Sequence, residues 1–275
     1  MKPAPFGYLR PDTLAEAIGL LKEWPQDARV MAGGQSLGPM LNLRLAQPKH
    51  VIDVSRLREL CDSSLSNDAL AIGACTTHAQ IEDGKITDVT RGLLAQVAKA
   101  IAYRAVRNRG TLGGSLAHAD PAADWLTTMI ALDASLELAG ANERSQVKVA
   151  KFVTGAMETT IEAAQVLTCV LVPRLSTRAR WGYAKYARKP GYFAESMAIV
   201  VVDPDRAFSR VVLGRRSEPP TLMQASSQVL AGKPTEPLTE KLGGAIELDL
   251  SSVRADQADW TMHRAIVLRA IRTLT

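Results

Sequence analysis

Few cysteines and no long apolar run are present in this 275-residue sequence, and each scarcity excludes a class of protein. The cysteines are too few for a disulfide framework and too far apart for a metal site: Cys61, Cys75 and Cys169. We expect them to be buried small hydrophobic side chains. No stretch of about 18 residues is apolar and uncharged, so no membrane-spanning helix is expected. The N-terminus lacks the apolar segment of a secretory signal, which favours a cytoplasmic protein.

Charge of one sign is nowhere concentrated. The chain has 33 lysines and arginines against 28 aspartates and glutamates, a net charge of +5. Because no run gathers this excess, a solvated surface is favoured over a nucleic-acid interface. A basic nucleic-acid-binding module built on Arg104, Arg107 and Arg109 is an alternative, but only Tyr103 stands nearby to stack on a base.

The sequence also lacks several motifs of common catalytic and nucleotide-binding centres. It contains no HExxH zinc motif, no P-loop and no GxGxxG after its first strand. We therefore expect neither a catalytic residue nor a metal site in this chain. The composition, 47% apolar and 22% charged, is typical of a globular protein. Because the catalytic motifs are absent, we expect the chain to hold a cofactor rather than to supply an acid, base or nucleophile.

Alternating strand and helix signals open the chain. Thr13 and Glu16 fit a capping box, and the apolar stripe behind them predicts a helix over 14–21. Short apolar runs then predict buried strands at 28–32 and 50–54. Between them, a proline suited to a first helical turn predicts a short helix over 36–44. This order is typical of a small βαβ unit.

The rest of the chain divides at a polar stretch. Residues 174–180 carry arginine and serine without an apolar pattern, which favours a domain boundary. Before it, we expect strands at 69–73, 134–138, 146–149 and 166–172, and helices at 77–82, 94–101 and 125–132. After it, we expect antiparallel strands at 183–186, 198–202 and 209–214, and helices at 219–230 and 260–274.

Two Gly-Gly turns, each followed by a serine, are the most informative feature. They are Ala32-Gly33-Gly34-Gln35-Ser36-Leu37 and, in a loop expected over 107–115, Thr111-Leu112-Gly113-Gly114-Ser115. Glycine lets the backbone approach a ligand, and successive amides form a concave site for an anion. Two such sites facing each other would hold a diphosphate. Neither turn has a lysine, which favours a bound pyrophosphate over phosphoryl transfer. Two ordinary tight turns are the alternative.

A polar segment follows the second turn. Asp120 and Asp124 stand four residues apart, and a helix that begins at Pro121 would make Asp120 its N-cap. Asp124 would then lie in the first turn and accept a hydrogen bond from a ribose hydroxyl. His118 is more typical of a neutral loop histidine than of a catalyst.

Together these motifs resemble those of a known family. Residues 32–37, 107–124 and 185–194 are similar to the FAD-binding medium subunit of molybdenum hydroxylases, of the carbon monoxide dehydrogenase and xanthine dehydrogenase type. The resemblance implies an α+β fold: a two-part FAD-binding domain of the vanillyl-alcohol-oxidase (PCMH) type, then a small C-terminal α+β domain with a three-stranded antiparallel sheet. The implied domains are 1–176, with parts of about 1–56 and 57–176, and 177–275.

The resemblance also implies FAD as the cofactor of this chain, bound by a set of named residues. Asp124 would hold ribityl or ribose hydroxyls, and Lys185 would lie at the pyrimidine edge of the flavin, where a cation stabilises the reduced form. The implied cofactor-binding residues are Ala32, Gly33, Gly34, Gln35, Ser36, Leu37, Ile101, Ala102, Thr111, Gly114, Ser115, Ala117, His118, Asp124, Leu167, Lys185 and Tyr192.

Some of these roles are more specific. Ile101 and Ala102 match a stretch on the nucleotide side, and Leu167 matches a position near the flavin ring. Two positions depart from the family pattern: many members have histidine in place of Gln35 and aspartate in place of Tyr192. An aromatic at Tyr192 would lie against the isoalloxazine, or serve as a structural aromatic at the domain junction.

The implied function is electron transfer within a larger enzyme. The resemblance implies a large partner subunit with a molybdenum-pterin cofactor, a small partner subunit with two [2Fe–2S] clusters, and a dimer of such heterotrimers. This chain would pass electrons from FAD to an external acceptor: NAD⁺, oxygen, a quinone or a cytochrome. The large subunit would choose the substrate. A self-contained FAD-dependent oxidase or dehydrogenase is the alternative within enzymes.

Overall fold

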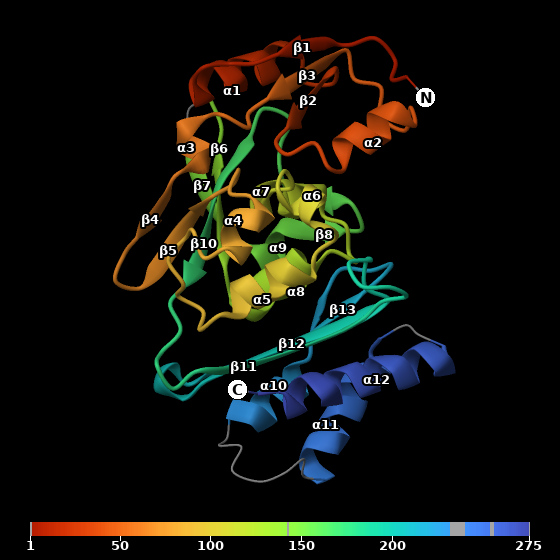
Figure 1. The fold of residues 1–275 in the computed structure, drawn as a ribbon. Coiled ribbons are helices and arrows are strands. Elements are labelled where there is room, and N and C mark those ends of the chain that lie inside the picture. Colours follow the sequence, from red (N-terminus) through yellow and green to blue (C-terminus); the bar gives the residue numbers. More distant parts are fainter. Residues whose placement is uncertain (1, 142, 232–239, 254–255, 275) are drawn as a thin grey trace.

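The computed structural model describes residues 2–141, 143–231, 240–253 and 256–274. The described chain forms three larger sheets with helices packed against them, in the order of the sequence from top to bottom in Figure 1. No helix in these residues is both long and apolar enough to cross a membrane.

The first part is a small parallel sheet with strand order β1-β3-β2. Its elements are β1 (Gly7–Leu9), α1 (Leu14–Glu23), β2 (Ala28–Met31), α2 (Leu37–Asn42) and β3 (His50–Asp53). Successive parallel strands need a crossover, which α1 and α2 supply. Thr13 caps α1 by accepting from the Glu16 amide at 3.2 Å. The predicted βαβ unit is confirmed.

The second part is an antiparallel five-stranded sheet with strand order β4-β5-β10-β6-β7. The strands are β4 (Ser63–Leu65), β5 (Ala69–Gly73), β6 (Ser135–Ala139), β7 (Arg144–Lys148) and β10 (Val166–Pro173), and a separate hairpin joins β8 (Val153–Gly155) to β9 (Glu158–Thr159). The helices are α3 (Arg58–Cys61), α4 (His78–Glu82), α5 (Leu93–Ala100), α6 (Arg104–Arg107), α7 (Leu112–His118), α8 (Asp124–Ala131) and α9 (Val149–Phe152). Figure 1 shows α4, α5, α7 and α8 together on one side of this sheet.

The C-terminal sheet has four antiparallel strands, so the expectation of three is wrong. The strands are β11 (Arg180–Tyr186), β12 (Ser196–Asp203), β13 (Phe208–Arg215) and β14 (Thr221–Leu222). The fourth strand lies within the stretch predicted as a helix over 219–230. Pro219 and Pro220 have no amide to donate in a helix, and Thr221 and Leu222 pair with β13 instead.

Helices cover both faces of this sheet. One face packs on α10 (Gln224–Ala231), α11 (Glu240–Ser251) and α12 (Gln257–Arg272), and the other on α8; η1 (Pro204–Arg206) joins β12 to β13. Side chains alternate along β12, so Val200 faces the C-terminal helices while Ile199 and Val201 join the core of the second part. Every residue of β12 is therefore buried. α11 was not predicted; it contains Gly243-Gly244, a pair that favours a turn.

Gly182 on β11 lies where α12 packs closely on the sheet. A Cβ at Gly182 would overlap the carbonyl oxygen of Ala270, whereas a Cβ at Gly243 in α11 would meet nothing within 4 Å. Gly182→Ala should lower the free energy of unfolding by about 2 kcal/mol through overpacking. The control Gly243→Ala should raise it by roughly 0.5–1 kcal/mol, as expected for alanine in a helix. Denaturant unfolding of both variants measures the difference, and equal stability of the two would contradict the packing described.

Candidate functional site

One cavity contains every residue to which the family resemblance assigns cofactor binding. Its volume is about 620 Å³, inside the range of roughly 300–1,000 Å³ typical of ligand and cofactor sites. The residues that line it include Ala32, Gly33, Gly34, Gln35, Ser36, Leu37, Ile101, Ala102, Thr111, Gly114, Ser115, Ala117, His118, Asp124, Leu167, Lys185 and Tyr192. The cavity thus draws its walls from all three parts of the chain.

The first glycine turn joins β2 to α2 along the cavity wall. Gly34 has a φ of +70°, a left-handed conformation that favours glycine. The Gly38 amide donates to the Gly34 carbonyl at 2.9 Å, where the chain enters α2. Ser36 is the N-cap residue of α2, yet its hydroxyl makes no capping hydrogen bond. Ser36 lines the cavity.

Gly34, Ser36 and Gly38 also spell GxSxG, the pattern of a serine nucleophile elbow. The backbone of Ser36 has φ −107° and ψ −51°, which is not the strained turn of such an elbow. In the part of the chain that the structure describes, the histidine rings that make hydrogen bonds do so with Trp125 and Ser196. The arrangement does not resemble a catalytic serine.

The second glycine turn is the start of a helix, so the expectation of a loop over 107–115 is only partly correct: residues 108–111 connect α6 to α7, whereas the glycine pair lies inside α7. Thr111 caps α7 by accepting from the Gly114 amide at 3.1 Å. A Cβ at Gly113 would overlap Ala74, which follows β5. Close packing of α7 on this strand end therefore outweighs the low helix propensity of the glycine pair.

The two glycine turns touch each other. A Cβ on Gly33 would overlap the carbonyl oxygen of Arg109, so the first turn lies directly on the backbone before α7. Gly110 also lies close to the ring of His78, because a Cβ at Gly110 would be 2.8 Å from the ring Nε2 atom. Residues without side chains are required for this approach. The structure thus places both turns at one cavity.

A buried ion pair forms another wall of the cavity. The Asp124 carboxylate accepts from Lys185 Nζ at 2.9 and 3.0 Å and from the Tyr183 hydroxyl at 2.8 Å. The paired side chains are only 5% and 10% exposed. Burial raises the pKa of the Asp124 carboxyl, and the Lys185 ammonium and the Tyr183 hydroxyl oppose that rise. Lys185 also donates to the Ala100 carbonyl at 3.4 Å, which joins β11 to the end of α5.

Asp120 does not cap a helix that begins at Pro121. Its Oδ1 accepts from the Ala122 amide at 3.0 Å, and α8 begins only at Asp124, with Ala123 as N-cap. The carboxylate is satisfied by this local turn, so the helix starts later than the proline suggested.

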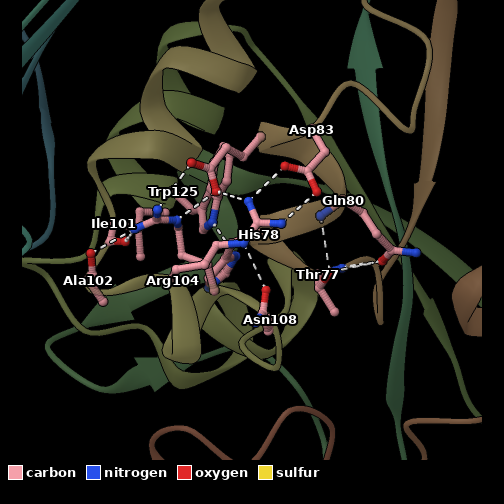
Figure 2. Close-up of polar contacts among 11 residues, drawn as sticks. Thr77, His78, Gln80, Asp83, Ile101, Ala102, Arg104, Asn108 and Trp125 are labelled. Atoms are coloured by element: carbon pink, nitrogen blue, oxygen red, sulfur yellow. Dashed lines mark hydrogen bonds and ion pairs between the residues drawn. The ribbon is translucent and has the colours of Figure 1, made fainter.

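Cys75 and His78 are among the titratable residues of the cavity wall that were not predicted. His78 is 5% exposed, and its Nδ1 accepts from the indole N–H of Trp125 at 3.1 Å (Figure 2). Burial and the nearby Arg107 lower the pKa of His78 to about 4, so its ring is neutral at neutral pH. Burial raises the pKa of the Cys75 thiol to about 12. Neither residue had a sequence signal, since both stand far along the chain from either glycine turn.

The expectation for the cysteines is only partly correct. Cys75 is buried, whereas Cys61 is exposed at the end of α3 and Cys169 is half-buried. In the described residues, no group of three His, Cys, Asp or Glu side chains is placed to hold a metal ion. Further lining residues without a sequence signal are Met31, Met157, Ile161, Gln165, Val166 and Phe193.

Comparisons with known proteins agree on one family. The family model described as "FAD binding domain in molybdopterin dehydrogenase" matches residues 4–175. The caffeine dehydrogenase subunit beta of Pseudomonas sp. (strain CBB1) is 32% identical over 238 residues, which cover 85% of this chain and 81% of that protein. The carbon monoxide dehydrogenase medium chain of Hydrogenophaga pseudoflava is 38% identical over 202 residues, which cover 74% of this chain and 70% of that protein.

A solved structure extends the similarity to the whole fold. It is the carbon monoxide dehydrogenase of Hydrogenophaga pseudoflava that lacks the Mo-pyranopterin moiety of the molybdenum cofactor. One of its chains superposes with a TM-score of 0.92 and 32% identity, covering 99% of this chain and 98% of that chain. The mixed α+β fold is therefore shared along nearly the full length.

The low pKa of His78 predicts a pH-dependent stability. The unfolded chain binds a proton at His78 below about pH 6.5, whereas the folded chain binds it only near pH 4. The free energy of unfolding is therefore highest above pH 6.5 and falls as the pH drops from 6.5 towards 4. Between about pH 6.5 and pH 4, wild type should lose about 3 kcal/mol more unfolding free energy than His78→Gln. Parallel pH profiles for His78→Gln and wild type would count against a buried neutral ring.

The ion pair predicts strong coupling between its members. Lys185→Met should destabilise the cofactor-free chain by about 3–5 kcal/mol, because it leaves the Asp124 carboxylate buried and unpaired. Adding Asp124→Asn should restore most of that loss, since the charge that lacked a partner is gone. Denaturant unfolding of both single variants and of the double variant measures the coupling. A double variant no more stable than Lys185→Met would refute it.

Proposed function

The chain belongs to the family of FAD-binding medium subunits of molybdopterin dehydrogenases, of the carbon monoxide and xanthine dehydrogenase type, and we propose that it binds FAD in the cavity between its two glycine turns. As a member it is a subunit of a dehydrogenase. We further propose that it receives electrons from [2Fe–2S] clusters of a partner subunit and passes them to an external acceptor. The observation that carries the proposal is that all the expected cofactor residues line one cavity.

The first glycine turn fits the diphosphate of FAD. Gly33 and Gly34 present backbone amides without side chains, and the Ser36 hydroxyl adds a donor that makes no capping bond. At the second turn the Gly114 amide already donates to the Thr111 hydroxyl. We infer that the first turn is the main phosphate contact and that the second turn supports it. The lack of a lysine in both turns agrees with holding a diphosphate rather than transferring a phosphoryl group.

The ion pair fits the ring and sugar portions. Asp124 holds Lys185 at a fixed position in the wall, so the ammonium meets a bound flavin without first being ordered. A carboxylate has about four acceptor sites, so Asp124 retains capacity for a ribityl or ribose hydroxyl after its bonds to Lys185 and Tyr183. Leu167 and Ile101 supply apolar surface beside these charges.

Tyr192 stands at the rim of the cavity. It is 44% exposed, beside the 61% exposed Phe193, on a segment that turns at Gly191 with a φ of +80°. We propose that the ring of Tyr192 lies against the isoalloxazine when FAD is bound and limits access to that face.

The chemistry assigned to this chain is positioning and tuning. FAD, when bound, accepts electrons singly and releases them in pairs. The residues of the chain fix its place, and no side chain here is needed as an acid, base or nucleophile toward an organic substrate. The proposed partners are a large subunit with a molybdenum-pterin cofactor and a small subunit with two [2Fe–2S] clusters, in a dimer of heterotrimers. In support, the relatives are themselves a "medium chain" and a "subunit beta".

We also propose the domain limits 1–176, in two parts of about 1–56 and 57–176, and 177–275. Three buried clusters support this division, since each is centred on one part, although the N-terminal cluster also includes Leu57, Leu60, Cys75, Ala139 and Val166 of the second part. The largest cluster includes Ile199, Val201 and Val212 of the C-terminal sheet, so the last domain packs firmly on the one before it.

Purification through a tag on this chain in its source organism tests the proposal. We expect flavin absorption bands, FAD released on denaturation at about one per chain, and two further subunits that carry iron and molybdenum. Gly33→Gln at the contact with Arg109 should abolish the flavin bands, because its side chain would have to occupy the backbone contact.

Three outcomes would contradict the proposal. A tagged wild-type chain without flavin would refute FAD binding. A flavin-containing chain that purifies alone and oxidises a small organic donor would favour the self-contained oxidase or dehydrogenase. Salt-sensitive retention of DNA by a colourless chain would favour the nucleic-acid-binding module.

A further inference from the structure

The short turn from Ala100 to Ala102 shapes one wall of the cavity. It connects α5 to α6, and both Ile101 and Ala102 line the cavity. Ala102 has a φ of +42°, a left-handed conformation that is uncommon for a residue with a side chain. Such a backbone persists where surrounding contacts determine it, so the turn needs an external support.

Arg107 supplies that support. Its Nη1 donates to the carbonyl oxygens of Ile101 and Ala102, each at 2.8 Å, while Nε and Nη2 donate to the Glu82 carboxylate at 2.8 and 3.1 Å (Figure 2). The Arg107 side chain is 12% exposed. The rigid guanidinium thus fastens the turn to α4, and a lysine has no equivalent planar fork.

The same turn supports groups that come from the C-terminal sheet. Lys185 Nζ donates to the Ala100 carbonyl at 3.4 Å. A Cβ at Gly191 would lie 2.8 Å from the Ala102 carbonyl oxygen, so the segment that carries Tyr192 rests on the Ala102 peptide. Moving this turn would therefore move the supports of both Lys185 and Tyr192.

We propose that Arg107 is a positioning residue for the cofactor: it holds the Ala100–Ala102 turn, and through that turn it sets Lys185 and Tyr192 at the cavity. This inference rests on the proposed function, in which FAD occupies the cavity. Arg107 does not itself line the cavity, so its effect on the cofactor is indirect.

Arg104 provides a matched control on the same short helix. It donates to Glu82 at 2.7 Å and to Asp83 at 2.6 and 2.7 Å, so it belongs to the same charge cluster. Its side chain is 47% exposed, and its other hydrogen bond goes to the Asn108 side chain rather than to the turn. Replacing Arg104 removes a cluster charge and leaves the two carbonyl contacts in place.

The test compares Arg107→Lys, Arg107→Met and Arg104→Met in the complex purified through a tag on this chain. We expect the dissociation constant for FAD to rise at least tenfold for Arg107→Met, less for Arg107→Lys, and less than twofold for Arg104→Met. We also expect the visible circular dichroism of bound flavin to change in the Arg107 variants only, since its neighbours Lys185 and Tyr192 move.

Glu82→Gln keeps the shape of the Arg107 partner but removes its charge. It should raise the FAD dissociation constant by a factor between those of Arg104→Met and Arg107→Met. It also keeps the inference testable if Arg107→Met fails to fold. A purely structural role for Arg107 would lower the melting temperature and leave FAD affinity and the dichroism of the folded fraction as in wild type; that result overturns the inference. Wild type without FAD would instead overturn the proposed function and this inference with it.

Discussion

The contact between Gly33 and the carbonyl of Arg109 is the constraint on which the cavity depends. It brings the turn after β2 onto the backbone before α7, with no side chain between them. The segment on the far side is itself fixed, because the Gly110 carbonyl accepts from the His78 amide at 2.9 Å and the Gly110 amide donates to Val106 at 2.7 Å. The N-terminal parallel sheet is thereby locked against the second part of the chain, and the space between the two becomes a site of defined shape.

The C-terminal sheet closes this site through few but firm contacts. Lys185 reaches across to Asp124 and to the Ala100 carbonyl, and Gly191 rests on Ala102. The sheet is rigid because β12 is buried on both faces, between α8 and the C-terminal helices. A site held by regular elements keeps its groups in place better than one made of loops. That rigidity suits a protein whose proposed task is to hold a cofactor at a fixed distance from an electron donor.

Local signals in the sequence predicted many elements of the fold, and the two glycine pairs that they singled out line one cavity. The Thr13 cap, the apolar stripes and the two glycine pairs are encoded within a few residues, and the structure bears them out as helix start, buried faces and cavity walls. Tertiary packing decided what local signals missed. The glycine pair at 113–114 lies in a helix because Ala74 packs against it, and the two-residue strand β14 exists only through β13.

Side-chain partnerships across the fold were beyond sequence reasoning for the same reason. Lys185 and Asp124 are 61 residues apart, and Arg107 meets Glu82 over 25. Each residue taken alone is typical of a surface charge, and only the folded chain shows which are paired and buried. The residues of the motifs lie at one cavity, whereas the supports of its walls became visible only in three dimensions.

The distribution of the cavity walls along the chain sets an order for biosynthesis. Lining residues come from before residue 50, from 54–124, from 157–167, and from Lys185 and the segment of Tyr192 and Phe193. Contacts so distant in sequence form late, after the segments between them have been made. Roughly two thirds of the polypeptide must therefore be synthesised before every wall of the cavity is present.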